Sequence, residues 1–188
     1  MLLAASMCAA VLVAVAVPAA AEPARWAVRA ADSEIGFSGT HAGRPFTGRF
    51  GNWRADITFD PADLAGSKAV VTVDLASAST GDATYDKTLP TSDWLDTGRF
   101  GAGVFTTSGF VATGQDAYTA QGELELRGVK VPVALDFTFQ AEGDVARLEG
   151  KTRLQRLAFG IGKGSDATGA WVSLDVPVTV KVALERMR

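Results

Sequence analysis

Few side chains in this sequence could do chemistry, and the single histidine is the first of them. His41 is the only side chain whose ordinary pKa lies near neutrality. A Ser–His–Asp site would need it, with Ser38 and either Asp32 or Asp56 as partners, but no G-x-S-x-G motif marks a nucleophile. We therefore predict a structural or ligand-contacting role for His41.

A group of aspartates is the second candidate: Asp82, Asp86, Asp93 and Asp96. Paired carboxylates can hydrolyse glycosidic bonds, and residues three or four apart meet on one face of a helix. Aspartate is also a common residue at helix caps and in turns, which explains the group without catalysis. We predict no catalytic residue and no metal site, with an enzyme as the less favoured alternative.

A glycine-rich segment, Gly160-Ile-Gly-Lys-Gly-Ser165, resembles a phosphate-binding loop. That loop needs Ser or Thr directly after its Lys and a helix behind it. Gly164 intervenes here and another strand-like segment follows. The segment is better interpreted as a glycine-rich connection between two strands.

Composition excludes several other classes. The chain has 188 residues, of which 47% are hydrophobic and 21% charged, and a formal net charge of −3. A disordered chain would have fewer apolar residues, and a nucleic-acid-binding protein would have clustered Lys and Arg. One Cys and one His are too few ligands for zinc sites, iron–sulfur clusters or disulfide scaffolds.

The first 21 residues have the pattern of a secretory signal peptide. An almost unbroken apolar run, Leu2 to Val17, leads to Pro18-Ala-Ala-Ala21 and then to the first charged residue, Glu22. The run is too short for a transmembrane anchor. It departs from the usual signal peptide in one respect, since no Lys or Arg precedes the apolar run. We expect cleavage near Ala21, a periplasmic or secreted location, and one domain over residues 22–188.

The remaining chain shows the period-two alternation of β-strands. From Val172 to Leu184 every second residue is apolar, and Val131 to Phe139 repeats the pattern. Further strand-like stretches are Trp26–Gly39, Phe46–Phe59 and Val145–Arg156, joined by short glycine-containing turns such as Arg127-Gly128. This predicts about eight antiparallel strands, with a short helix and loop only at residues 82–96.

Eight antiparallel strands form either a closed barrel or a two-sheet sandwich. A barrel of this size is either filled by side chains or just wide enough for a small ligand. An outer-membrane barrel shows the same alternation, but the chain lacks girdles of aromatic residues. The alternation leaves open whether the interior is filled or hollow.

The order of several short motifs resembles the YceI-like family of exported, lipocalin-like proteins. The resemblance extends from Trp26 to Glu185. Its landmarks are Trp26-Ala-Val28, Ser33-Glu-Ile35-Gly-Phe37, His41-Ala-Gly43, Phe46-Thr-Gly48-Arg-Phe50, Ala76-Ser-Ala-Ser-Thr-Gly81, Ser92-Asp-Trp94-Leu-Asp96, Gly122-Glu-Leu-Glu-Leu126-Arg-Gly128-Val-Lys-Val-Pro132-Val133 and Arg156-Leu-Ala-Phe159-Gly-Ile-Gly162. Where the family usually has Arg-Asp-x-His-Leu, this chain has Tyr85-Asp-Lys-Thr-Leu89.

The resemblance implies an eight-stranded antiparallel lipocalin-like barrel with a short helix near one end. It also implies an apolar tunnel for an isoprenoid, such as a polyprenyl quinone, or for another long-chain amphiphile, and no cofactor besides such a lipid. The residues that we expect to line the tunnel are Phe37, Phe46, Phe50, Trp94, Phe105, Leu126, Phe137, Phe159, Val176 and Val178. Those expected to contact a head group are His41, Arg44 and Asp86.

Relatives of the family are associated with membrane cytochromes of the b561 type, which suggests a partner, and a homodimer is a second expectation. We expect no nucleic acid partner. The main alternative to lipid binding is a solid-core module that binds a protein partner or serves a structural role. That alternative predicts a filled interior. An enzyme acting on isoprenoid or sugar substrates is the less favoured alternative.

Overall fold

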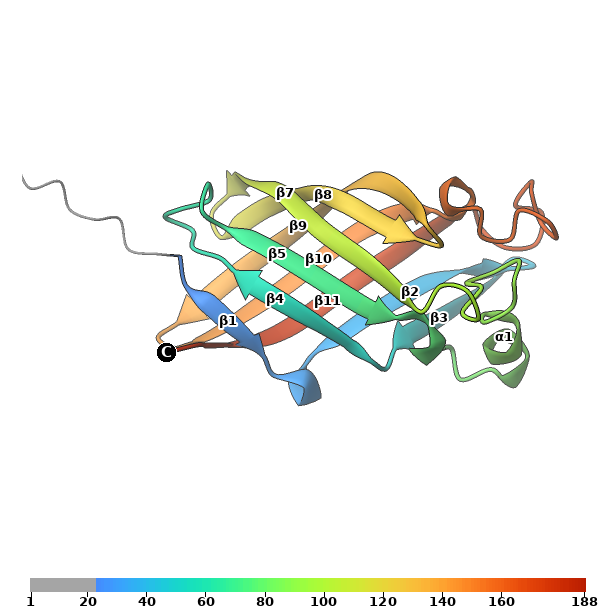
Figure 1. Cartoon of the computed structure of the whole chain (residues 1–188), viewed down its shortest axis with the longest axis horizontal. Coiled ribbons are helices and arrows are strands. Elements are labelled where there is room, and N and C mark those ends of the chain that lie inside the picture. The colour runs from blue at the N-terminus through green and yellow to red at the C-terminus, as the bar shows by residue number, and fades with distance from the viewer. Residues whose placement is uncertain (1–22) are drawn as a thin grey trace, which may run out of the picture.

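The structure, a computed structural model, describes residues 23–188 and consists mainly of one antiparallel sheet that closes on itself (Figure 1). The expected signal peptide and its cleavage site at Ala21 lie outside the described residues. The strands are β1 (Arg25–Val28), β2 (Glu34–His41), β3 (Arg44–Phe50), β4 (Trp53–Thr58), β5 (Lys68–Asp74), β6 (Ala78–Ser79), β7 (Ala102–Gly114), β8 (Ala117–Leu126), β9 (Val129–Glu142), β10 (Val145–Gln155) and β11 (Asp175–Arg186).

The barrel has the predicted eight strands, closed by the pairing of β1 with β11. Around the ring the order is β1, β4, β5, β7, β8, β9, β10, β11. The other three strands continue the sheet beside β11, in the order β2, β3, β6. Consecutive segments are the two halves of three interrupted strands: β1 with β2, β3 with β4, and β5 with β6. With the uninterrupted strands β7 to β11 they make eight long strands.

The interruptions correct two of the predicted strands. A 3₁₀ turn at Ala30–Asp32 divides the stretch Trp26–Gly39, and Gly51-Asn52 divides Phe46–Phe59. Across the first break the Ser33 hydroxyl accepts from the backbone N–H of Ala183 in β11, at 3.0 Å, so the sheet stays connected. Interruptions of this kind bend a strand, which a closed barrel of this size requires.

The hairpin turn predicted at Arg127-Gly128 is confirmed, and a second turn of the same kind was not predicted. Arg127 and Gly128, between β8 and β9, both have positive φ, at 52° and 72°. Ala42 and Gly43, between β2 and β3, do the same at 49° and 78°. Two consecutive residues of positive φ define the turn whose twist suits a two-residue hairpin.

One end of the barrel is a solid aromatic plug. The Phe59 ring contacts the rings of Phe110, Tyr118, Phe137 and Phe139, with centroid distances of 4.8–5.5 Å, mostly edge to face. The Trp26 Nε1–H donates to the carbonyl oxygen of Phe59 at 2.9 Å. All of these rings but Phe110 belong to the buried core, so the barrel is filled at the end where the described chain terminates (Figure 1).

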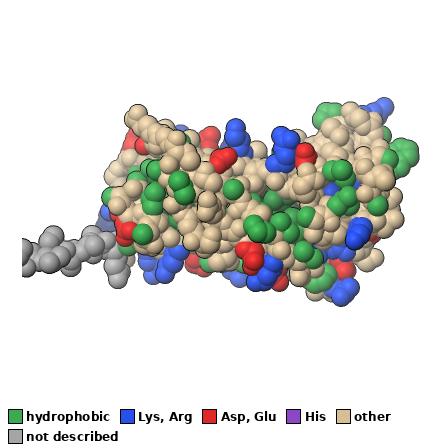
Figure 2. Space-filling model, turned by 90° about the horizontal axis from the view of Figure 1, so that it is seen from above, with side chains coloured by type: hydrophobic (Ala, Val, Ile, Leu, Met, Phe, Trp, Pro, Cys, Tyr) green, Lys and Arg blue, Asp and Glu red, His purple; other side chains and the backbone are tan. Residues whose placement is uncertain are grey.

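The apolar face of the sheet points into the barrel and the polar face points out. On β11, Val182 and Leu184 are buried while Thr179 and Lys181 are exposed. Figure 2 shows positive and negative side chains interspersed along one long face. This arrangement is the reverse of a membrane barrel, whose apolar face contacts lipid.

At the other end lies α1 (Ala83–Thr88), within the segment where a short helix was expected (Figure 1). The Asp82 side chain caps it by accepting from the N–H groups of Thr84 and Tyr85. No helix within residues 23–188 is long and apolar enough to cross a membrane.

Candidate functional site

A central cavity of about 150 Å³ occupies the middle of the barrel. Inward side chains of β2, β4, β5, β7, β8, β9, β10 and β11 line it, and none of them is charged. Phe105, Phe137 and Val178 were predicted to line a tunnel, and the structure places all three here. The middle of the barrel is therefore hollow rather than solid.

The two hydroxyl groups in the cavity wall are occupied by the backbone. Thr107 Oγ1 donates to the Ala69 carbonyl at 3.2 Å and accepts from the Ala69 N–H at 2.8 Å. Thr152 Oγ1 donates to the carbonyl of Ala134 at 2.7 Å. With both hydroxyls satisfied, the cavity offers hydrocarbon surface and no free donor to a guest, which suits an apolar chain.

A second cavity, of about 160 Å³, lies beneath α1 and forms the mouth of the barrel. We call it the mouth cavity; it is lined by His41, Phe46, Thr80, Thr84, Tyr85, Thr88, Leu89, Trp94 and Val172. His41 Nδ1 and the Tyr85 hydroxyl are 3.0 Å apart and share a hydrogen bond. Mixed polar and apolar walls of this kind can orient the polar end of an amphiphile.

Several apolar side chains lie, along their own strands, between the residues that line the two cavities. Register places Phe37, Phe50, Leu126 and Val176 on the inward face, beyond the central cavity and toward α1, and Leu75 joins them from the loop after β5. Leu75 is only 1% exposed. We call these five residues the partition layer. Four of them were predicted to line the tunnel, and they line neither cavity in this structure.

The remaining predicted residues divide between the mouth and the supporting structure. Phe46, Trp94 and His41 line the mouth cavity. Phe159 is 2% exposed in a 3₁₀ turn that packs on β9, and it borders neither cavity.

The two other expected head-group residues do not line the mouth cavity either. Arg44 is exposed at the tip of the β2–β3 hairpin, and the Asp86 carboxylate is engaged by its own loop. The interpretation of both as head-group contacts remains a prediction from the sequence.

Asp86 fastens α1 to the barrel. Its carboxylate accepts from the Thr80 N–H and hydroxyl and from the Ser79 hydroxyl, each at 2.7 Å. These hydrogen bonds, that of the Thr80 N–H first, lower the pKa of Asp86 to about 2. The mouth wall formed by α1 thus depends on an ionised carboxylate.

Asp93 joins two loops beside the mouth. It accepts from the N–H of Gly164 at 2.7 Å and from the N–H of Ser165 at 2.8 Å, and the Ser165 hydroxyl adds a bond at 2.5 Å. These bonds, the hydroxyl's first, lower the pKa of Asp93. The glycine-rich segment that resembled a phosphate loop therefore binds an anion, and that anion belongs to the chain itself.

A buried ion pair organises the loop between β10 and β11. Arg156 is 2% exposed, and its Nη2 lies 2.8 Å from Asp166 Oδ2. The guanidinium also donates to the carbonyls of Ile161, Val172 and Ser173. The pKa of Asp166 is lowered, first by the N–H of Val172.

The aspartates of residues 82–96 have structural roles that account for them. Asp82 caps α1, Asp86 and Asp93 accept from backbone N–H groups, and Asp96 lies 3.7 Å from Arg99. Within residues 23–188 no group of three or more His, Cys, Asp or Glu side chains could hold a metal ion. The capping interpretation of these residues fits their observed contacts.

Sequence reasoning missed several lining residues. Tyr85 and the threonines of α1 border the mouth, while Trp53 and Phe59 border the central cavity. Trp53, Ala55 and Ile57 alternate in sequence, and this signal could have identified their inward face. No periodic signal marks the residues of a six-residue helix.

These observations define a class: a closed eight-stranded antiparallel barrel with an apolar interior and a helix-covered mouth. The sequence pattern of the YceI-like domain matches residues 26–184. The chain therefore belongs to the YceI-like family. UPF0312 proteins are among its relatives: one from Vibrio parahaemolyticus is 30% identical over 158 residues, which cover 79% of this chain and 84% of the relative. One from Shewanella oneidensis is 32% identical over 168 residues, covering 81% and 88%.

Solved structures share the fold. BcnA of Burkholderia cenocepacia superposes with a TM-score of 0.80 at 26% identity, covering 83% of this chain and 98% of BcnA. A polyisoprenoid binding domain from Saccharophagus degradans, implicated in plant cell wall breakdown, gives a TM-score of 0.69 at 14% identity, covering 86% and 98%. The predicted lipocalin-like barrel of this family is thus confirmed.

Proposed function

We propose that this protein binds an isoprenoid, such as a polyprenyl quinone, or another long-chain amphiphile. The apolar chain lies in the barrel, and the polar end lies at the mouth cavity near His41 and Tyr85. The observation that carries the proposal is the uncharged central cavity, whose hydroxyl groups are already bonded to backbone. Membership of the YceI-like family and the shared fold of a polyisoprenoid binding domain support it.

Burial of hydrocarbon supplies the free energy of binding. Transfer of apolar surface from water is favourable by about 25 cal/mol per Å². A quinone carbonyl, a hydroxyl or an amide at the mouth could exchange hydrogen bonds with the Tyr85–His41 pair. The barrel would then hold the molecule for storage, transport or presentation, after export to the periplasm.

The proposal names a lipid as the ligand and does not depend on a protein partner. A membrane cytochrome of the b561 type and a second copy of the chain stay predictions from the family resemblance. Binding of a lipid does not require either of them.

Native mass spectrometry followed by organic extraction tests the proposal. The full chain, expressed in a host that exports it, should carry an added mass that is released as a prenyl or fatty species. An unliganded mass that persists after incubation with prenyl quinones and fatty amides would exclude lipid binding and favour a partner-binding module.

A matched pair of variants links the binding to the barrel interior. Val178 lines the central cavity, whereas its neighbour Thr179 points outward. Val178→Asp should lose the bound lipid, because a buried unpaired carboxylate is costly beside a hydrocarbon chain. Thr179→Asp should keep it, and both variants are checked for folding by circular dichroism.

A further inference from the structure

Resting on the proposed function, we propose that Phe37 determines which chain lengths the barrel accepts. Along β2 this residue lies between a residue of the central cavity and a residue of the mouth cavity. A guest confined to one cavity leaves the ring in place, whereas a longer chain must displace it.

The position of Phe37 follows from the register of β2. Along the inward face of this strand, Ile35 lines the central cavity and His41 lines the mouth cavity. Phe37 lies between them and lines neither. On β11 its partner Val178 lines the central cavity, and Val176 is the next inward residue toward the mouth.

Two glycines leave room for large rings at this level of the barrel. Gly48 pairs with Phe37 across β2 and β3, and a Cβ there would overlap the end of the Phe37 ring. Gly39 pairs with Phe46, and a Cβ there would lie 2.8 Å from Phe46 Cζ. The Phe37 ring therefore rests on the bare backbone of Gly48, and the Phe46 ring on that of Gly39.

Other members of the partition layer also have close neighbours. Leu75 is 1% exposed, and Leu126 fills the space above Gly103, where a Cβ would lie 2.7 Å from Leu126 Cδ2. Phe50 packs against Phe37 with ring centroids 5.2 Å apart. Phe37 is half-buried, as are Phe50, Leu126 and Val176, but it lies on the strand that joins Ile35 of the central cavity to His41 of the mouth cavity, so we assign the rotamer change to it.

Cavity size decides when the ring must move. A dry cavity of about 150 Å³ holds a molecule the size of benzene, which corresponds to about one isoprene unit. A chain of several units extends from the mouth through the partition layer. The apparent affinity for such a chain equals the intrinsic affinity multiplied by the fraction of protein in which the ring is displaced. A one-unit guest has no such loss of affinity.

Equilibrium dialysis with two radiolabelled alcohols tests the inference: prenol, with one isoprene unit, and geranylgeraniol, with four. If the ring is displaced in about a tenth of the molecules, Phe37→Ala should strengthen geranylgeraniol binding about tenfold and leave prenol binding nearly unchanged. The quantity to compare is the ratio of the two dissociation constants.

Phe137→Ala is the matched control, because it removes the same ring from the wall of the central cavity without joining the two cavities. It should change the ratio less than Phe37→Ala does. Equal changes would show that added volume alone is responsible and would overturn the inference. Phe37→Leu, with a smaller change in volume, replaces Phe37→Ala if the latter fails to fold.

The outcomes separate this inference from the proposed function. Wild-type protein that binds geranylgeraniol, with a ratio that Phe37→Ala leaves unchanged, would overturn only the role of Phe37. Failure of wild type and Phe37→Ala alike to bind either alcohol would overturn both. Binding of geranylgeraniol by Phe37→Ala but not by wild type would be the strongest support.

Discussion

The carboxylate of Asp86 accepts four hydrogen bonds from three consecutive residues, Ser79, Thr80 and Gly81. Asp93 and Asp166 serve in the same way for other loops at the mouth. At the scale of single residues, ionised side chains therefore replace regular secondary structure in fixing the mouth. This explains how segments with little helix or strand can hold a cavity open.

Acid should loosen α1 through Asp86. Its pKa falls from 3.8 to about 2 on folding, so its stabilising effect is complete above pH 3.8 and is lost as the pH falls toward 2. The melting temperature of wild type should therefore drop more steeply over this interval than that of Asp86→Asn. Asp93 and Asp166 contribute to both proteins, and parallel curves would show that Asp86 has no such role.

Phe59 should be among the residues most sensitive to truncation. Phe59→Ala removes a ring that is 2% exposed and touches four other rings, so we expect a loss of about 3–5 kcal/mol in the free energy of unfolding. Urea denaturation measures it. Val111→Ala, at a side chain that is 48% exposed, serves as the control and should stay within about 0.5 kcal/mol of wild type.

At the scale of elements, alternation of apolar residues predicted the strands, and short glycine-containing turns predicted the hairpins. The breaks at Ala30–Asp32 and Gly51-Asn52 were missed, because a strand that bends keeps its alternation on either side. The division of the interior was missed too. Alternation assigns Phe37 and Val176 to the inward face, but it does not give the volume that their side chains leave free.

The loop between β10 and β11 should depend on Arg156. Arg156→Ala leaves Asp166 buried without its partner and several carbonyls without a donor, so we expect a loss of about 3–5 kcal/mol. Arg153→Ala breaks an exposed pair with Asp175, at 3.3 Å, and should cost no more than about 1 kcal/mol. Similar losses in the two variants, measured by urea denaturation, would contradict this account of the loop.

At the scale of the whole molecule, the barrel has one sealed end and one end that can admit a guest. The aromatic plug around Phe59 fills the first, and α1 with the loops around Trp94 and Val172 borders the second. Under the proposed function, a ligand would reach the interior past α1. Its bound chain would contact strands from all around the ring.

Binding should accordingly stabilise the entire barrel. At a free ligand concentration of 100 times the dissociation constant, a guest that binds only the folded state adds about 2.7 kcal/mol. For a domain of this size the melting temperature should rise by about 5–10 °C, measured by scanning calorimetry on delipidated protein before and after addition of lipid. Val178→Asp should show no rise, and a rise in that variant would place the binding outside the barrel.

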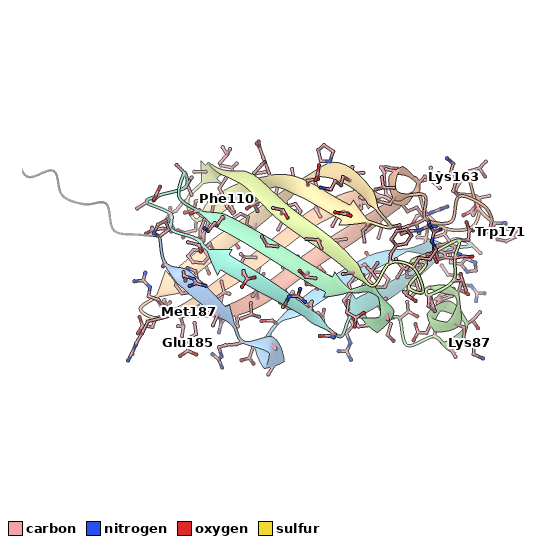
Figure 3. All side chains as sticks on the ribbon, in the orientation of Figure 1. Lys87, Phe110, Lys163, Trp171, Glu185 and Met187 are labelled. Carbon is pink, nitrogen blue, oxygen red and sulfur yellow. The ribbon has the colours of Figure 1, made fainter. Side chains whose placement is uncertain are left out.

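The pairing of β1 with β11, Trp26 opposite Arg186, brings the first and last residues of the described chain together at the sealed end of the barrel. Glu185 and Met187 lie there, whereas Lys87, Lys163 and Trp171 lie at the far end beside the mouth (Figure 3). An attachment at Arg188, to a bead, a sensor surface or a fused protein, therefore holds the molecule by its closed base. The opening beside α1 then lies at the end away from the support, where the proposed ligand would exchange with the surrounding fluid.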